Sequence, residues 1–304
     1  MSALHRFVWP LAVANLVANI AIVVTGGAVR LTGSGLGCPT WPKCTDESYV
    51  VHGELGVHGI IEFGNRMLTW VLVVIAVATF LAVWRSDRAR ATRLAAIIAL
   101  GIPAQGILGG ITVLTDLNPW IVALHLLVSM AIIGVCVILL DELRGPVRPA
   151  EDRLQRPAWL VFGATWLTLY LGTVVTGSGP HSGDLESRRT GLDPQVMSHV
   201  HAAAVYLLIA LTFGLLVISH RQGAVVVRRA AAVLLGLELA QGLVGFVQYF
   251  TDLPEILVGV HMLGAALISA AVTWTALSTR GRTDAPAQPK SSGSRATATN
   301  SSDR

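Results

Sequence analysis

Long apolar runs alternate with short polar segments along the whole chain. A membrane-spanning helix needs about 20 mainly apolar residues, and eight runs approach or exceed that length: residues 7–29, 57–84, 93–114, 119–140, 157–177, 195–219, 229–250 and 254–278. The pattern therefore predicts an all-α integral membrane protein with eight transmembrane helices. We expect the first run to be retained as a helix, because it is longer than the 7–15 apolar residues of a signal peptide.

One apolar hairpin occurs twice in the sequence. Residues 104–125 and 240–261 align without a gap at an offset of 136, and they share Ala-Gln-Gly, Thr-Asp-Leu and a closing histidine, His125 in one copy and His261 in the other. Apolar segments often resemble one another by chance, but a shared Gln, Thr-Asp and His in one register does not arise that way. The sequence therefore indicates a duplication.

The duplication divides the chain into two halves of four helices each. The halves are residues 1–145, with an outer loop at 30–56, and residues 146–280. Because each half has an even number of helices, both enter the membrane from the same side as parallel repeats. Thr25-Gly26 and Thr176-Gly177 match at an offset of 151 rather than 136, so we expect the first outer loop to be about 15 residues longer than its counterpart.

Charge is scarce and unevenly placed. Charged residues are 13% of the chain, against roughly 25% in soluble proteins. The arginine-rich segments 85–93, 141–156 and 220–229 are alternate loops, so the positive-inside rule places them and both termini in the cytoplasm of a cell membrane protein. This placement accounts for the net charge of +4 without a nucleic-acid partner. Residues 281–304 are polar and small, and we expect a disordered cytoplasmic tail.

Two of the three cysteines, Cys38 and Cys44, lie in the first outer loop. That loop should face an oxidising compartment, so a disulfide is our preferred interpretation. A metal pair with His52, or two free thiols that only pack, are the alternatives. Cys136 lies inside a predicted helix and is most simply a buried small hydrophobic residue.

At the offset of 136, four predicted helices carry equivalent residues: Asn65, His125, His201 and His261. All four lie roughly 10 Å from the outer ends of their helices. A histidine inside the membrane is costly and usually functional, although a hydrogen bond to a neighbouring helix is the alternative. Two imidazoles from facing helices can hold a haem iron, which predicts such a site for His201 and His261. His199 competes with His201, but it lies about 200° further round the helix.

The first half lacks one of these histidines. Asn65 is a poor iron ligand, so a haem there would be held by His125 alone or with a substitute. His58 is on the same helical face as Asn65 but about 10 Å nearer the outer surface. A surface or gating role for His58 is an equal alternative.

Glu62 is a second costly residue in the first half. It shares a helical stripe with Arg66, four residues on, so a Glu62–Arg66 ion pair is one interpretation. The other is a carboxylate aimed at a substrate and serving proton transfer. Its equivalent in the second half is Ser198. This asymmetry suggests a permanent cofactor in the second half and chemistry in the first.

Several motifs resemble the haem A synthase family. The motifs are the outer-loop sequence of residues 26–44, Ile-Glu-Phe-Gly-Asn-Arg at 61–66, Leu-His-Leu-Leu at 124–127, Thr-Gly-Ser-Gly-Pro-His at 176–181, His201, and Val-His-Met-Leu at 260–263. The resemblance covers residues 7–278. It departs from the better-known family pattern at Asn65, where that pattern has histidine.

The resemblance implies an oxidoreductase that converts the C8 methyl of haem O to a formyl by successive hydroxylations. The product, haem A, serves aa3-type cytochrome oxidases. It also implies haem b between His201 and His261, substrate haem O at His125 beside Asn65 and Arg66, and an essential Glu62. A disulfide between the outer cysteines is implied as well. Candidate partners are haem O synthase and cytochrome oxidase assembly factors, and a homo-oligomer is left open.

Two other functions compete with this one. A di-haem b-type electron carrier that oxidises quinol would need four good ligands, and Asn65 argues against that. A non-enzymatic haem carrier would function without Glu62. Arg30, Arg66 and Lys43 lie near the outer face and are candidates to pair with haem propionates, although Arg30 is also suited to anchor its helix end.

Overall fold

The computed structural model describes residues 7–86, 88–145, 147–150, 152–181, 183–184 and 187–282. Within these ranges the chain forms eight helices long and apolar enough to cross a membrane, which confirms the predicted fold class. Their ends lie within a few residues of the predicted ones. They are α1 (Val8–Leu31), α2 (Gly56–Trp84), α3 (Ala89–Leu114), α4 (Pro119–Leu143), α5 (Asp152–Ser178), α6 (Pro194–Arg221), α7 (Val225–Phe250) and α8 (Glu255–Ser278).

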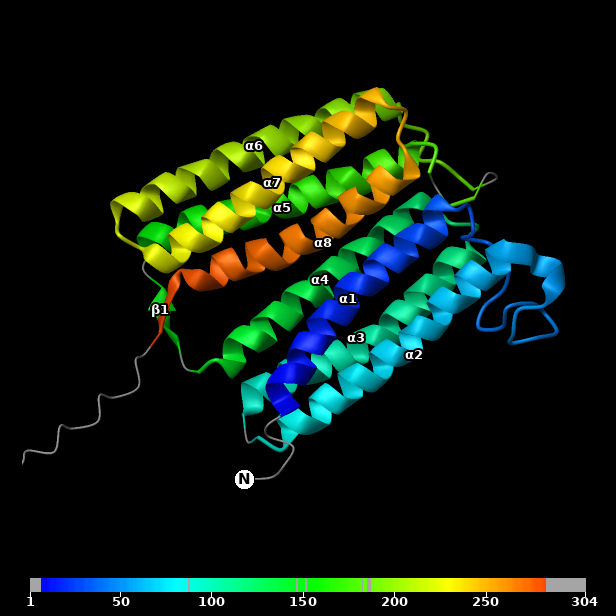
Figure 1. Cartoon of the computed structure of the whole chain (residues 1–304), viewed down its shortest axis with the longest axis horizontal. Coiled ribbons are helices and arrows are strands. Elements are labelled where there is room, and N and C mark those ends of the chain that lie inside the picture. Colours follow the sequence, from blue (N-terminus) through cyan, green and yellow to red (C-terminus); the bar gives the residue numbers. More distant parts are fainter. Residues whose placement is uncertain are drawn as a thin grey trace, which may run out of the picture.

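The helices form two bundles that lie side by side, α1–α4 and α5–α8 (Figure 1). Within each bundle consecutive helices pack together and the first packs on the last, so α2 and α4, like α6 and α8, occupy opposite corners. The bundles meet through α1, α4, α5 and α8. We call the end with the loops 32–55 and 179–193 the disulfide end, and the end where α1 begins and α8 finishes the arginine end. The membrane side of each end stays a prediction.

Large apolar side chains cover the outside of both bundles. Val74 of α2 and Leu100 of α3 are 68% and 73% exposed, for example. A soluble protein rarely exposes so much continuous apolar surface, whereas a bilayer accepts it because lipid tails are themselves apolar. The backbone polar groups are satisfied inside each helix, as hydrocarbon requires.

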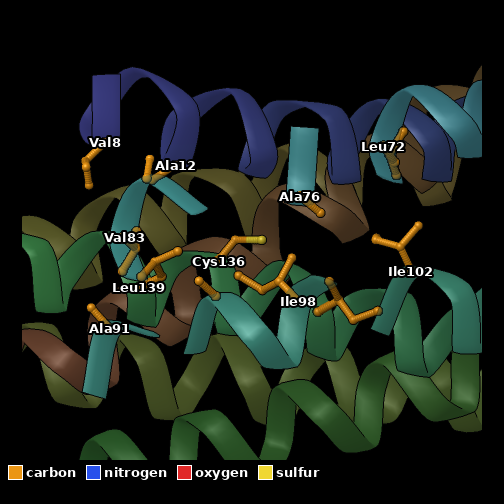
Figure 2. Packing of buried hydrophobic residues seen from close by; sticks show 13 residues of the cluster. Val8, Ala12, Leu72, Ala76, Val83, Ala91, Ile98, Ile102, Cys136 and Leu139 are labelled. Atoms are coloured by element: carbon orange, nitrogen blue, oxygen red, sulfur yellow. The ribbon is translucent and has the colours of Figure 1, made fainter. Parts of the chain in front are cut away.

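The interior of the first bundle is closely packed with small and branched apolar side chains toward the arginine end (Figure 2). Ala76 and Ala91 let the helices approach closely, while Ile98 and Leu139 fill the space between them. Cys136 is a free, buried thiol within this cluster, as predicted. Asn15, Asn19 and Thr79 form a small buried polar group within it, and His125 lies nearer the disulfide end. The apolar half thus forms a rigid base for that end.

The duplicated Thr-Asp-Leu sequence forms the same turn in both halves. Asp116 and Leu117 have φ values of 52° and 55°, and Asp252 and Leu253 have 56° and 59°. Positive φ is uncommon outside glycine, so its recurrence at four equivalent positions is informative. Each leucine amide also donates to the carbonyl five residues earlier, at 2.8 and 3.0 Å. The turn fixes where α4 and α8 begin, and hence the depth of His125 and His261.

Two short strands were not predicted. β1 (Val147–Ala150) pairs antiparallel with β2 (Arg280–Arg282) at the arginine end, joining the link between the halves to the end of α8. The expected tail at 281–304 therefore begins with two residues of a strand. Residues 283–304 lie outside the described part of the chain.

Candidate functional site

Three histidines of the spanning helices, one each in α4, α6 and α8, pack against a glycine on the helix before their own. A methyl group added to that glycine would lie 3.4, 3.2 and 3.7 Å from the ring Cε1 atom in the pairs Gly109–His125, Gly172–His201 and Gly245–His261. The Nδ1 atoms of His125 and His261 are buried without a hydrogen-bond partner, whereas His201 lies within reach of the Thr168 backbone. Buried polar atoms are normally satisfied, so buried rings in three equivalent places indicate ligand-binding groups. They fit a haem, which needs only one or two axial imidazoles from the protein.

The fourth pair contains Asn65 instead of histidine. A methyl group on Gly26 would lie 3.8 Å from Asn65 Nδ2, and the Thr25 hydroxyl donates to Asn65 Oδ1 at 2.8 Å. Gly26 of α1 thus corresponds to Gly172 of α5, an offset of 146. The offset of 151 taken from the Thr-Gly motif was wrong. Correspondingly, 24 residues separate α1 from α2 and 15 separate α5 from α6, a smaller difference than expected.

In the second half, His201 and His261 come from opposite corners of the bundle. Each ring lies against a glycine of the helix that precedes its own. His199 is exposed and lies against Tyr249, with its Nε2 3.5 Å from the tyrosine oxygen. The helical rotation between residues two apart separates the two histidines in this way. Among the described residues no three His, Cys, Asp or Glu side chains cluster as a metal site.

In the first half, Glu62 forms the ion pair with Arg66 that was considered as one alternative. Its Oε1 atom accepts from Arg66 Nε at 3.1 Å and from Nη2 at 2.5 Å. Its Oε2 atom accepts from the backbone N–H of Cys38 at 2.6 Å. Arg66 donates further to the carbonyls of Cys38, Thr40 and Lys43. The buried pair therefore ties α2 to the outer loop, and Glu62 lies at the boundary between them.

The outer loop is fastened to the first bundle at several points. Cys38 and Cys44 form the predicted disulfide, so the metal pair with His52 is not what the structure contains. The Trp41 ring lies against Gly110 of α3, where an added methyl group would come within 2.4 Å of it. The equivalent of Gly110 in the second half is Phe246. The first half thus has a tryptophan beside the glycine pair that faces His125, and the second half has no room for one.

His58 helps to hold the outer loop and does not lie at the depth of Asn65. It is exposed, and its Nδ1 atom lies 2.9 Å from the Ser34 hydroxyl. Its carbonyl is so close to Gly37 that an added methyl group there would lie 2.3 Å away. The structure therefore places His58 where it holds the loop, as in the surface alternative.

The three cationic residues considered for haem propionates are bonded to backbone carbonyls. Arg30 crosses from the first half to the second and donates to His181 O at 2.6 Å and Thr176 O at 3.1 Å. Lys43 donates to Asp46 O at 3.2 Å. Arg66 is held as described above. Arg30 therefore joins the halves at the disulfide end.

Gln105, from the shared Ala-Gln-Gly motif, supports His125. Its Nε2 atom donates to the His125 carbonyl at 2.9 Å and also to the Ser129 hydroxyl. Its equivalent, Gln241, packs instead on Gly264 of α8, three residues beyond His261. The motif thus contacts the histidine-bearing helix in both halves, through different atoms.

Sequence reasoning missed one buried carboxylate. Glu238 of α7 is only 2% exposed; its Oε1 accepts from the Thr212 hydroxyl at 2.9 Å, and its Oε2 has no partner. Its equivalent in the first half is Ile102. An acidic residue inside a predicted span was a sufficient signal. The second half therefore has a buried carboxylate of its own, deeper in the bundle than Glu62.

Comparisons with known proteins place these features in a family. A family model described as cytochrome oxidase assembly protein (COX15-CtaA) matches residues 9–180, which span the first half and α5. The chain is also similar to the haem A synthases of Methylobacterium radiotolerans, Sinorhizobium fredii and Azorhizobium caulinodans, with 27%, 25% and 26% identity. The first alignment covers 62% of this chain and 60% of that relative; the others cover 83% and 84%, and 86% and 90%.

Proposed function

The chain belongs to the cytochrome oxidase assembly protein family, whose model spans more than half of it, and from this premise we propose that it is a haem A synthase. Its relatives carry that name. The proposed reaction oxidises the C8 methyl of haem O stepwise to a formyl, giving haem A. The observation that supports this assignment most is the unequal pair of sites: two facing histidines in one half, and a histidine, an asparagine and a clamped carboxylate in the other.

The second half holds the resident cofactor, haem b. His201 and His261 would hold it through their imidazoles, and Gly172 and Gly245 give the rings room. A haem held this way supplies one-electron redox chemistry. The protein's own contribution is to fix both imidazoles on rigid helices and to exclude water from the bundle.

The first half binds the substrate, haem O. His125 holds it from α4, and Gln105 fixes the backbone of that helix turn. Asn65 and Arg66 lie on the facing helix α2. The outer loop, with Trp41 against Gly110 and the disulfide beside Arg66, covers this half at the disulfide end and keeps water from it. Such exclusion strengthens the electrostatic interactions of buried groups.

Glu62 is the proposed catalytic residue. With water as the oxygen source, oxidation of the methyl to a hydroxymethyl releases two protons and two electrons; a redox acceptor would take the electrons, and a nearby carboxylate can accept a proton. Arg66 and the Cys38 amide hold both carboxylate oxygens, so they position Glu62 and set its charge. The carboxylate and the loop therefore act as one unit, and the absence of an equivalent at Ser198 leaves the second half without this step.

The setting follows from the fold. The eight apolar helices make a multi-pass membrane protein, and we propose the cell membrane with both termini in the cytoplasm. Haem O synthase would supply the substrate and cytochrome oxidase assembly factors would receive the product.

Expression of the chain in cells that make haem O, followed by chromatography of extracted haems, tests the function. We expect hydroxymethyl and formyl products with the unaltered chain and their loss with Glu62→Gln. A chain that binds two haems and transfers electrons without changing haem O would be a di-haem carrier instead. Product formation that persists in Glu62→Gln would remove Glu62 from the reaction.

A further inference from the structure

The position opposite His125 differs chemically from its three equivalents. At the other three positions an imidazole lies against a glycine, but here the carboxamide of Asn65 lies against Gly26. An amide nitrogen has no lone pair available to bind a metal, and it acts only as a hydrogen-bond donor. The first half therefore has one axial ligand where the second half has two.

The orientation of the Asn65 amide is set by its neighbour on α1. The Thr25 hydroxyl lies 2.8 Å from Asn65 Oδ1 and 3.2 Å from the Ile22 carbonyl, and it donates its single hydrogen to the nearer Asn65 oxygen. One lone pair of this oxygen, the only acceptor atom of the amide, is thereby engaged. The amino group, Nδ2, is left with two N–H bonds to donate. Thr25 thus positions the amino group of Asn65, a hydrogen-bond donor, at the depth of His125.

The other potential ligands on α2 are held elsewhere. His58 is exposed and is bound at the disulfide end by Ser34, about 10 Å along the helix from Asn65. Both oxygens of Glu62 accept hydrogen bonds, from Arg66 and from the Cys38 amide. Neither side chain is placed to substitute for the missing imidazole.

We propose that the substrate haem is held by His125 alone, and that its other axial position is an open binding site for a small ligand stabilised by Asn65 Nδ2. This inference rests on the proposed function of the first half. The ligand belongs to the class of water, azide and carbon monoxide: small, iron-binding, and able to accept a hydrogen bond. Polarity and donors beside an open position decide whether a haem binds and activates small molecules or only transfers electrons.

The two halves then differ in reactivity for a simple reason. His201 and His261 close both axial positions of the resident haem, so that haem is unreactive toward small ligands. The substrate haem has a vacant position on the side of α2, the helix that also bears Glu62. The carboxylate and the vacant position are three residues apart on one helix face, so proton transfer and ligand binding take place on the same side of the substrate.

Ligand binding to the full-length chain in nanodiscs, loaded with haem O, tests this directly. We expect carbon monoxide to bind one of the two reduced haems in the unaltered protein. Asn65→His should supply the missing imidazole, turn the loaded haem low-spin and lower its carbon monoxide affinity by roughly tenfold or more. Asn65→Ala should keep the open position but lower azide affinity about fivefold, the value of one hydrogen bond. Thr25→Val should shift the C–O stretching frequency in the same direction as Asn65→Ala.

The resident haem b spectrum reports correct folding of every variant. If the unaltered protein loaded with haem O shows two low-spin haems and no carbon monoxide binding, a second protein ligand is present and the inference is wrong. Binding that is unchanged in Asn65→His also overturns it. Failure of the proposed function appears separately, as the absence of oxidised haem from a chain that nevertheless binds carbon monoxide.

Discussion

The two halves of this protein share a scaffold but not a site. Both contain the same positive-φ turn before the histidine-bearing helix, and both place a glycine of the preceding helix against that histidine. They differ at many positions, and four of these differences change the surroundings of the two sites. Asn65 replaces an imidazole, Glu62 replaces Ser198, Gly110 replaces Phe246, and Ile102 replaces Glu238. The duplicated bundle thus keeps its frame while the side chains at its two sites differ.

The comparison also shows where each half is covered. The longer loop of the first half is tied to α2 by Arg66 and packs Trp41 on α3. The shorter loop of the second half has Arg189 bonded to Pro180 O. Arg30 joins the two loops' ends across the boundary between the bundles. The first half, which is proposed to exchange its haem, is therefore the one with the longer loop and the more numerous loop contacts.

Removing one histidine from each half should give the largest difference in haem binding between the two halves. His261→Ala should abolish the low-spin haem b spectrum, because one of its two axial ligands is lost. His125→Ala should keep that spectrum and lose only haem O binding. Optical spectra and haem content of the purified variants measure both. Equal loss of haem b from the two variants would contradict the division of roles.

Replacing Glu62 tests its proposed role in proton transfer. Glu62→Gln should lower product formation at least about 100-fold, because the proton acceptor is gone, while the haem b content is unchanged. Ser198→Ala, at the equivalent position, is the matched control and should leave product formation unaltered. Chromatography of extracted haems gives the result. A similar loss in both variants would show that the position acts through folding instead.

Introducing a second-half residue at the equivalent position of the first half tests the contact between the outer loop and α3. Gly110→Phe should displace Trp41, since even a methyl group there would lie 2.4 Å from the ring. Overpacking of this kind costs roughly 1–3 kcal/mol, and we expect lower thermal stability and lower activity. Phe246→Ala is the control: Phe246 is 50% exposed, so the change should stay within about 1 kcal/mol. Equal shifts in a thermal unfolding assay would mean that Trp41 does not cover the site.

The smallest expected difference lies within the second half. Gly172→Ala adds a methyl group 3.2 Å from His201 Cε1, whereas Gly245→Ala adds one 3.7 Å from His261 Cε1. The first contact is tight and should move the ring, speeding haem b dissociation by roughly tenfold. The second is an ordinary contact and should have little effect. Transfer of haem to apomyoglobin measures both rates, and the reverse order would refute the proposed ring positions.

Sequence patterns predicted the helices well because hydrocarbon imposes a length and a polarity on each span. They also predicted that Asn65, His125, His201 and His261 lie at one depth, since a gapless repeat preserves depth. They did not predict how Arg66 bonds to loop carbonyls, because those contacts depend on the path of an irregular loop. They misplaced α5 against α1 by five residues, because a short Thr-Gly match is weaker than packing. Glu238 was missed because the repeat alignment pairs it with an apolar residue, Ile102, and so does not mark the position as polar in both halves.

We propose that the second half keeps its haem while the first half exchanges its own. A chase with ⁵⁷Fe-labelled haem O tests this most directly, using the purified chain loaded with unlabelled haem and following the label by Mössbauer spectroscopy. The account predicts that the label enters only a site that is lost in His125→Ala, while the low-spin site of His201 and His261 stays unlabelled. Label appearing first in the low-spin site would contradict it.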